Sequence, residues 1–119
     1  MGPSGCNAIQ KFLPKIIEEK KINFVIANGE NAADDGVGIT EEIAKNLFNS
    51  GINVLTTGNH VWDHSEAMEY ILKENKLLRP ENLVQPSPGK GFEIYITSNG
   101  IKIGAVSYTH LTLPTILLV

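Results

Sequence analysis

Two short polar segments of the chain carry residue types that can do chemistry. Asn28-Gly-Glu-Asn31 and Gly58-Asn-His60 together bring a carboxylate, amide oxygens and an imidazole. Glu30 can bridge two cations, and the asparagine amides suit hard or borderline metal ions. His60 can serve as a metal ligand, a phosphate-positioning donor or a general acid. Either segment alone is typical of an ordinary turn, so the prediction of a site depends on the two occurring together.

Both polar segments directly follow apolar runs that predict buried strands. Residues 23–27 and 52–56 are apolar nearly throughout, as expected for parallel strands that are covered on both faces. A helix that begins after Thr40 and stops at Gly51 is predicted between them. In an open α/β sheet, ligands collect at the carboxyl ends of the strands. We therefore expect both polar segments to meet in one crevice at that edge.

Two more helices and a hairpin complete the predicted fold. Residues 8–17 have apolar side chains at helical spacing, with Asn7 as the expected cap and Pro14 expected to kink or shorten the helix. A third helix is expected to open at Asp63 or Ser65. Beyond residue 80 apolar residues alternate with polar or exposed positions, as in two strands. The first row is Phe92, Ile94 and Ile96, and the second is Ile101, Ile103 and Ala105. Between them lies Asn99-Gly100, a strong hairpin signal. The predicted fold class is α/β, with parallel strands and crossover helices followed by a β-hairpin.

The composition limits the classes of function. The chain has 119 residues, of which 42% are hydrophobic and 19% charged, which is typical of one globular domain or a piece of one. The net charge of −3 is no signature of nucleic-acid binding, and no apolar run predicts a membrane span or a signal peptide. The single Cys6 is expected to be a packed residue in a reducing compartment. We predict a cytoplasmic protein. The sequence does not determine the oligomeric state, and a homo-oligomer is compatible with it.

Both ends of the chain differ from what an α/β domain predicts. Residues 1–5 have the character of a loop that follows a strand, so a first strand is expected to be missing. Residues 106–115 resemble the translation of a common sequencing adapter. We therefore predict that residues 1–105 are the N-terminal part of a domain and that residues 106–119 are an artefactual tail. His110 is excluded from the candidate ligands for this reason.

Longer stretches around the two polar segments resemble one known family. Gly58-Asn-His60 is similar to the signature of calcineurin-like metallophosphoesterases. Five stretches of the chain, in order, resemble the YmdB-type bacterial branch of that family. They are residues 28–33 (NGENAA), 36–40 (GVGIT), 57–63 (TGNHVWD), 79–82 (RPEN) and 88–91 (PGKG). The resemblance extends from about residue 2 to residue 105. It implies that the chain is a fragment of a layered metallophosphoesterase sandwich.

The resemblance also implies a role for each matching residue. Glu30 would be the metal-bridging carboxylate, Asn31 and Asn59 would be ligands of the second metal ion, and His60 would protonate the leaving group. Asn28 and Asp63 would support these residues without binding the metal ions themselves. Asp63 either orients His60 or caps a helix. The family's first-strand aspartate would lie before Met1 and its later histidine ligands beyond Ala105.

Two functions of different classes follow from these expectations. In the first, the full-length parent is a metal-dependent phosphodiesterase that uses two divalent or mixed-valence metal ions, Fe or Mn, on a phosphodiester such as a cyclic nucleotide. The chain by itself would then be incomplete and inactive. In the second, the gene product is a regulatory module that binds a phosphate ligand or a protein without turnover. Histidine motifs in the downstream coding sequence would favour the enzyme.

Overall fold

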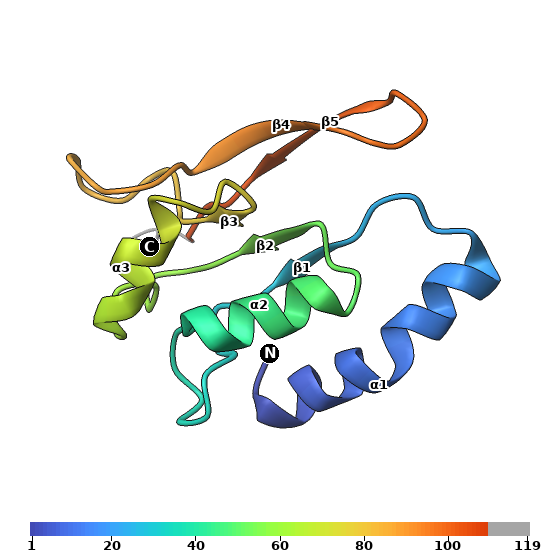
Figure 1. Cartoon of the computed structure of the whole chain (residues 1–119). Helices are drawn as coiled ribbons and strands as arrows, with labels where there is room; N and C mark the ends of the chain where they lie inside the picture. The colour runs from blue at the N-terminus through green and yellow to red at the C-terminus, as the bar shows by residue number, and fades with distance from the viewer. Residues whose placement is uncertain (110–119) are drawn as a thin grey trace, which may run out of the picture.

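The computed structural model describes residues 1–109 and arranges them in three layers (Figure 1). The middle layer is a parallel sheet in the order β1 (Ile26–Asn28), β2 (Val54–Thr56) and β3 (Leu77–Leu78). Helices α1 (Pro3–Lys20) and α2 (Glu41–Asn49) lie on one side, and the antiparallel pair β4 (Phe92–Ile96) and β5 (Lys102–Val106) lies on the other (Figure 1). Helix α3 (Ser65–Ile71) connects β2 to β3. The predicted fold class is confirmed.

The two faces of the parallel sheet form separate apolar clusters. Leu55 and Leu77 point to the helices and pack in a cluster that includes Leu47 of α2. Val54 and Leu78 point to the hairpin and pack with Ala105. Because successive residues of a strand face opposite sides, β2 and β3 are buried on both faces, as their continuous apolar sequence predicts.

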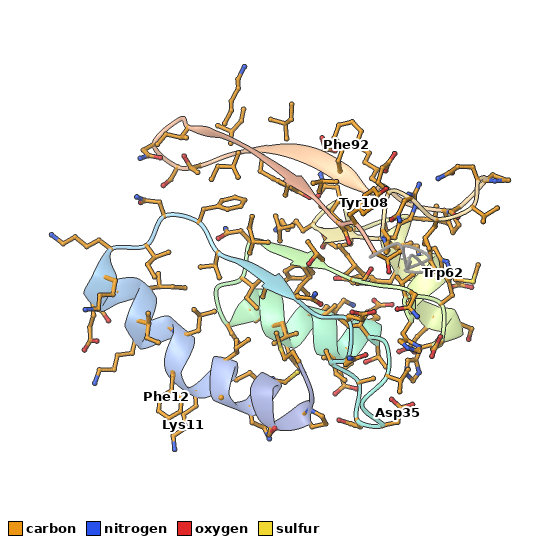
Figure 2. All side chains as sticks on the ribbon, turned by 180° about the vertical axis from the view of Figure 1, so that it is seen from behind. Lys11, Phe12, Asp35, Trp62, Phe92 and Tyr108 are labelled. Atoms are coloured by element: carbon orange, nitrogen blue, oxygen red, sulfur yellow. The ribbon has the colours of Figure 1, made fainter. Side chains whose placement is uncertain are left out.

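Helix α1 is longer than the sequence pattern predicts. It begins at Pro3 rather than after Asn7, since the fixed φ of proline suits the first helical position. It continues through Pro14 to Lys20, so the expected shortening is wrong, while the alternative of a kink at Pro14 stays a prediction. Only part of the predicted apolar face packs: Ile9 and Leu13 contact the core, whereas Phe12 is 52% exposed and extends away from the sheet (Figure 2).

Helix α2 follows its prediction closely. The Thr40 hydroxyl accepts a hydrogen bond from the backbone N–H of Ile43 at 3.3 Å, which satisfies one free donor of the first turn. The acidic residues Glu41 and Glu42 occupy that turn, where they complement the helix dipole. The N-cap position of α3, in contrast, is His64, without a capping hydrogen bond from its side chain. Neither Asp63 nor Ser65 is therefore the cap, although the helix does begin at Ser65.

Strand β1 is less buried than its sequence predicts. The apolar run predicts a strand covered on both faces, but Ile26 is 46% exposed. Its neighbours Val25 and Ala27 pack against the helices, while Ile26 points to the hairpin side. The hairpin covers Val54 and Leu78 of the other two strands, which leaves Ile26 at the edge of the covered area.

The hairpin is confirmed, but its two apolar rows lie on opposite faces. The antiparallel register pairs Ile94 with Gly104 and Tyr95 with Ile103. Directly paired residues share a face, so Ile103 and Ala105 point toward the sheet with Tyr95. The row Phe92, Ile94 and Ile96 points outward and is 59–67% exposed.

The predicted boundary after Ala105 does not coincide with a boundary in the fold. Strand β5 continues through Val106, the Ser107 hydroxyl donates to the Thr57 carbonyl at 2.6 Å, and Thr109 pairs with the side chain of Asn82. The origin of residues 106–109 stays a prediction. Residues 110–119, including His110, lie outside the described residues. Over residues 1–109, no helix is both long and apolar enough to cross a membrane.

Candidate active site

The two polar segments start from neighbouring positions at one edge of the sheet. In the parallel register, Asn28 at the end of β1 lies beside Thr56 at the end of β2. The backbone N–H of Gly29 donates to the Thr56 carbonyl at 2.8 Å, which extends the pairing by one step into the turn. The structure therefore brings both segments together at the carboxyl edge, as predicted.

Glu30 crosses from the end of β1 to the turn after β2. A β-carbon built on Gly58 would overlap the carboxyl group of Glu30, so the carboxylate fills the space that a side chain at position 58 would occupy. Asn28 supports this turn, since its Oδ1 accepts a hydrogen bond from the backbone N–H of Glu30 at 2.8 Å. Glycine at position 58 is thus required for Glu30 to approach the second polar segment.

His60 is held by Asp63. The ring nitrogen Nδ1 of His60 lies 2.9 Å from Oδ2 of Asp63, and both side chains are 43% exposed. An ionised carboxylate only accepts hydrogen bonds, so Nδ1 carries the proton and donates it to this bond. The contact leaves Nε2, on the opposite side of the ring, free of Asp63. The pairing matches the orienting alternative for Asp63, while the helix-capping alternative is wrong because His64 holds that position.

The turn after β2 is anchored by contacts that the sequence did not indicate. Thr57 is 4% exposed, and its hydroxyl donates to the Leu78 carbonyl of β3 at 2.8 Å. The backbone N–H of Thr57 donates to the same carbonyl at 2.9 Å. The segment Gly58–His60 therefore leaves the sheet from a fixed point. A threonine directly after an apolar run carries no sequence signal for such a role, because it is also an ordinary strand residue.

The oxygen donors at this edge would fill only part of the coordination shell of a metal ion. Glu30 supplies carboxylate oxygen, and Asn31 and Asn59 are exposed amides at the same edge, which together suit an oxygen-preferring cation. Among residues 1–109, no group of three or more His, Cys, Asp or Glu side chains is arranged to hold a metal ion. This donor set by itself does not amount to a two-metal centre, and the metal-binding roles stay predictions.

A cavity of about 610 Å³ lies next to this edge without including the candidate residues. It is bordered by the first turns of α1 and α2 and by the segment from Ala32 to Asp35, with His64 and Glu66 on its wall. Cys6 lines the cavity and is buried, as predicted; burial raises the pKa of its thiol above the ordinary value. The neutral thiol therefore persists to higher pH than in an exposed cysteine.

Comparison with known proteins defines the class of fold. The chain superposes on the crystal structure of a phosphatase from Mycoplasma pneumoniae with a TM-score of 0.82 and 26% identity, covering 95% of this chain and 41% of that one. It superposes on a hypothetical protein from Thermus thermophilus with a TM-score of 0.80 and 34% identity, covering 91% of this chain and 41% of that one. The α/β fold of this chain is thus shared with a phosphatase of known structure.

The sequence comparison then gives the family. The chain is 37% identical over 107 residues to the 2′,3′-cyclic-nucleotide 2′-phosphodiesterase of Bacillus subtilis (strain 168), covering 90% of this chain and 40% of the relative. Residues 1–112 match the family of YmdB-like proteins. The chain belongs to the YmdB-like family, which confirms the resemblance noted in its sequence. It spans about two fifths of the length of the relatives that it matches.

Proposed function

We propose that the protein made from the complete reading frame hydrolyses phosphodiesters, with His60 as the proton donor to the leaving oxygen. The observation that carries this proposal is the His60–Asp63 contact at the same sheet edge as Glu30. The relatives support the reaction class, since one is a cyclic-nucleotide phosphodiesterase and another a phosphatase. We propose cyclic nucleotides as the substrate class, following the name of the Bacillus subtilis relative.

In this reaction His60 would transfer the proton and Asp63 would hold the ring of His60 in position. Hydrolysis adds water to phosphorus and breaks the bond to the leaving oxygen, which must then take a proton. With Nδ1–H of His60 engaged by Asp63, Nε2 carries a proton only in the imidazolium form of the ring. That form would give its Nε2 proton to the leaving oxygen, and the proton lost by the attacking water would restore it. Asp63 would keep the ring in one orientation during both transfers.

Glu30, Asn31 and Asn59 would supply oxygen ligands to metal ions at this edge, and Fe or Mn are the proposed metals. When bound, such ions supply Lewis acidity to the phosphoryl oxygens and to the attacking water. The Asn28 hydrogen bond and the absent side chain of Gly58 fix the approach of Glu30, so they would support the metal position indirectly. For the 119-residue chain alone we propose weak metal binding and negligible turnover.

The test measures turnover of the complete protein, purified with Mn or Fe, on a 2′,3′-cyclic nucleotide and on a linear diester. His60→Ala should lower kcat by about 10²–10⁴-fold, the usual contribution of a general acid. Asp63→Asn should lower it by about 10–100-fold, because an amide cannot hold the ring as an ionised carboxylate does. Lys102→Ala, an exposed change on β5, is the control and should leave kcat unchanged.

Two results would contradict the proposal. Full activity in His60→Ala would remove this residue from the reaction. Lack of turnover on both diesters by folded, metal-loaded protein would reject hydrolysis. Retained binding of the nucleotide in that case would favour the regulatory module.

A further inference from the structure

The loop after Glu30 folds back onto the turn that carries His60. Gly38 has a φ of +72°, and a β-carbon built on it would lie 2.7 Å from the carbonyl oxygen of His60 and 3.5 Å from Cβ of Asp63. Glycine is thus required at position 38 for two reasons, namely the positive φ and the close approach of the His60 carbonyl. The segment Asp34–Gly38, which we call the return loop, therefore lies close against the turn that carries His60 and Asp63.

His64 fastens the return loop to this turn. Its Nε2 lies 2.9 Å from the backbone carbonyl oxygen of Val37 and 3.5 Å from Oδ1 of Asp35. A carbonyl oxygen only accepts, so Nε2 carries a proton and donates it to Val37. The side chain is 27% exposed, so the bond is partly shielded from water.

An ordinary structural role of His64 would be to cap α3, since it occupies the N-cap position. The side chain makes no capping hydrogen bond, however, and reaches instead across 27 residues of sequence to Val37. The imidazole therefore joins two loops and does not cap the helix.

Gly38 also ties the return loop to Asn31. Gly38 forms an isolated parallel bridge with Asn31, and its carbonyl accepts a hydrogen bond from Ala33 at 3.0 Å. Within the loop, the N–H of Gly36 donates to Ala33 and that of Val37 donates to the side chain of Asp35. The loop is therefore a bonded unit whose last residue, Gly38, pairs with Asn31 and lies close to the His60 turn.

We propose that His64 is a positioning residue, which clasps the return loop against the His60 turn and so fixes His60 relative to Asn31. The consequence for turnover rests on the proposed phosphodiester hydrolysis. His64 need not touch the substrate, because the spacing of the proton donor and the metal-binding edge depends on the clasp. A displacement of even about 1 Å at such a site can lower the rate by about 100-fold.

The test uses the complete protein with His64→Ala, His64→Gln and Asn53→Ala. Asn53 is a matched control, because its Oδ1 makes a comparable 2.8 Å hydrogen bond to the N–H of Val25 away from the carboxyl edge. His64→Ala should lower kcat by about 10–100-fold with KM changed less than about twofold. His64→Gln, whose amide can donate to Val37, should restore most of the rate. Asn53→Ala should lower the Tm but leave kcat intact.

A double-mutant cycle and hydrogen exchange separate the clasp from general stability. In a His60→Ala background, His64→Ala should have little further effect on kcat, because its effect is transmitted through His60. Amide exchange of Gly36 and Val37 should be faster in His64→Ala and unchanged in Asn53→Ala. Equal loss of kcat in Asn53→Ala, or unchanged exchange in His64→Ala, would overturn the proposal. Faster exchange in His64→Ala, with no turnover by the unsubstituted protein, would reject hydrolysis and retain the clasp.

Discussion

The carboxyl edge of the parallel sheet and the β4–β5 hairpin are built in opposite ways. At the edge, turns from distant parts of the sequence are joined by side-chain contacts, such as Thr57 to Leu78 and His64 to Val37. The hairpin joins residues that are close in sequence, and its outer apolar row has no covering among residues 1–109 (Figure 2, where Phe92 is labelled). The candidate chemistry therefore depends on non-local contacts, whereas the hairpin depends on local pairing.

The largest contrast is expected between two glycines. Gly58→Ala should lower the activity of the complete protein by more than about 100-fold, because the new methyl group overlaps the Glu30 carboxyl and must displace it. Gly104→Ala in β5 should leave activity unchanged, since nothing lies within 4 Å of the added carbon. Both variants would be assayed with cyclic and linear diesters and for metal content. Normal metal content and rate in Gly58→Ala would show that Glu30 does not need this position.

A second contrast concerns stability and compares two apolar side chains. Leu55 is fully buried in β2, so Leu55→Ala should lower the free energy of unfolding by about 2–5 kcal/mol. Ile94 is 59% exposed on the hairpin, so Ile94→Ala should change it by less than about 0.5 kcal/mol. Urea titration followed by circular dichroism measures both. A large loss in Ile94→Ala would show that a further part of the protein covers the hairpin.

The smallest expected effect is a pH dependence confined to the hairpin. A hydrogen bond from Lys90 holds the pKa of Glu93 below its ordinary value. A carboxyl whose pKa is lowered by folding stabilises the fold above its unfolded pKa, and this contribution is lost as the pH falls through the folded pKa. Lys90→Ala should therefore raise the pKa of Glu93, as followed by NMR titration. Turnover near pH 7 should not change, and a parallel loss of activity would contradict the separation of the two regions.

Local sequence patterns determined much of the fold. Thr40 and the two glutamates after it fixed the start of α2, and Asn99-Gly100 with flanking alternation fixed the hairpin. The apolar runs before Asn28 and Gly58 placed both polar segments at strand ends. These predictions succeeded because caps, turns and side-chain periodicity act over a few residues. The predicted start of α1 was wrong, since the helix begins at Pro3, among residues whose local pattern predicted a loop.

Only the tertiary structure decided how the polar segments meet. No local pattern shows that the Glu30 carboxylate occupies the space next to Gly58. Nor does one show that position 38 must lack a side chain because the His60 carbonyl lies against it. The two alternatives for Asp63 were both consistent with the sequence; the 2.9 Å contact with His60 and the N-cap position of His64 separated them. His64 carried no signal at all, because its partner Val37 lies 27 residues away. Contacts of this kind depend on the packing of loops against one another, which the sequence determines only through the whole fold.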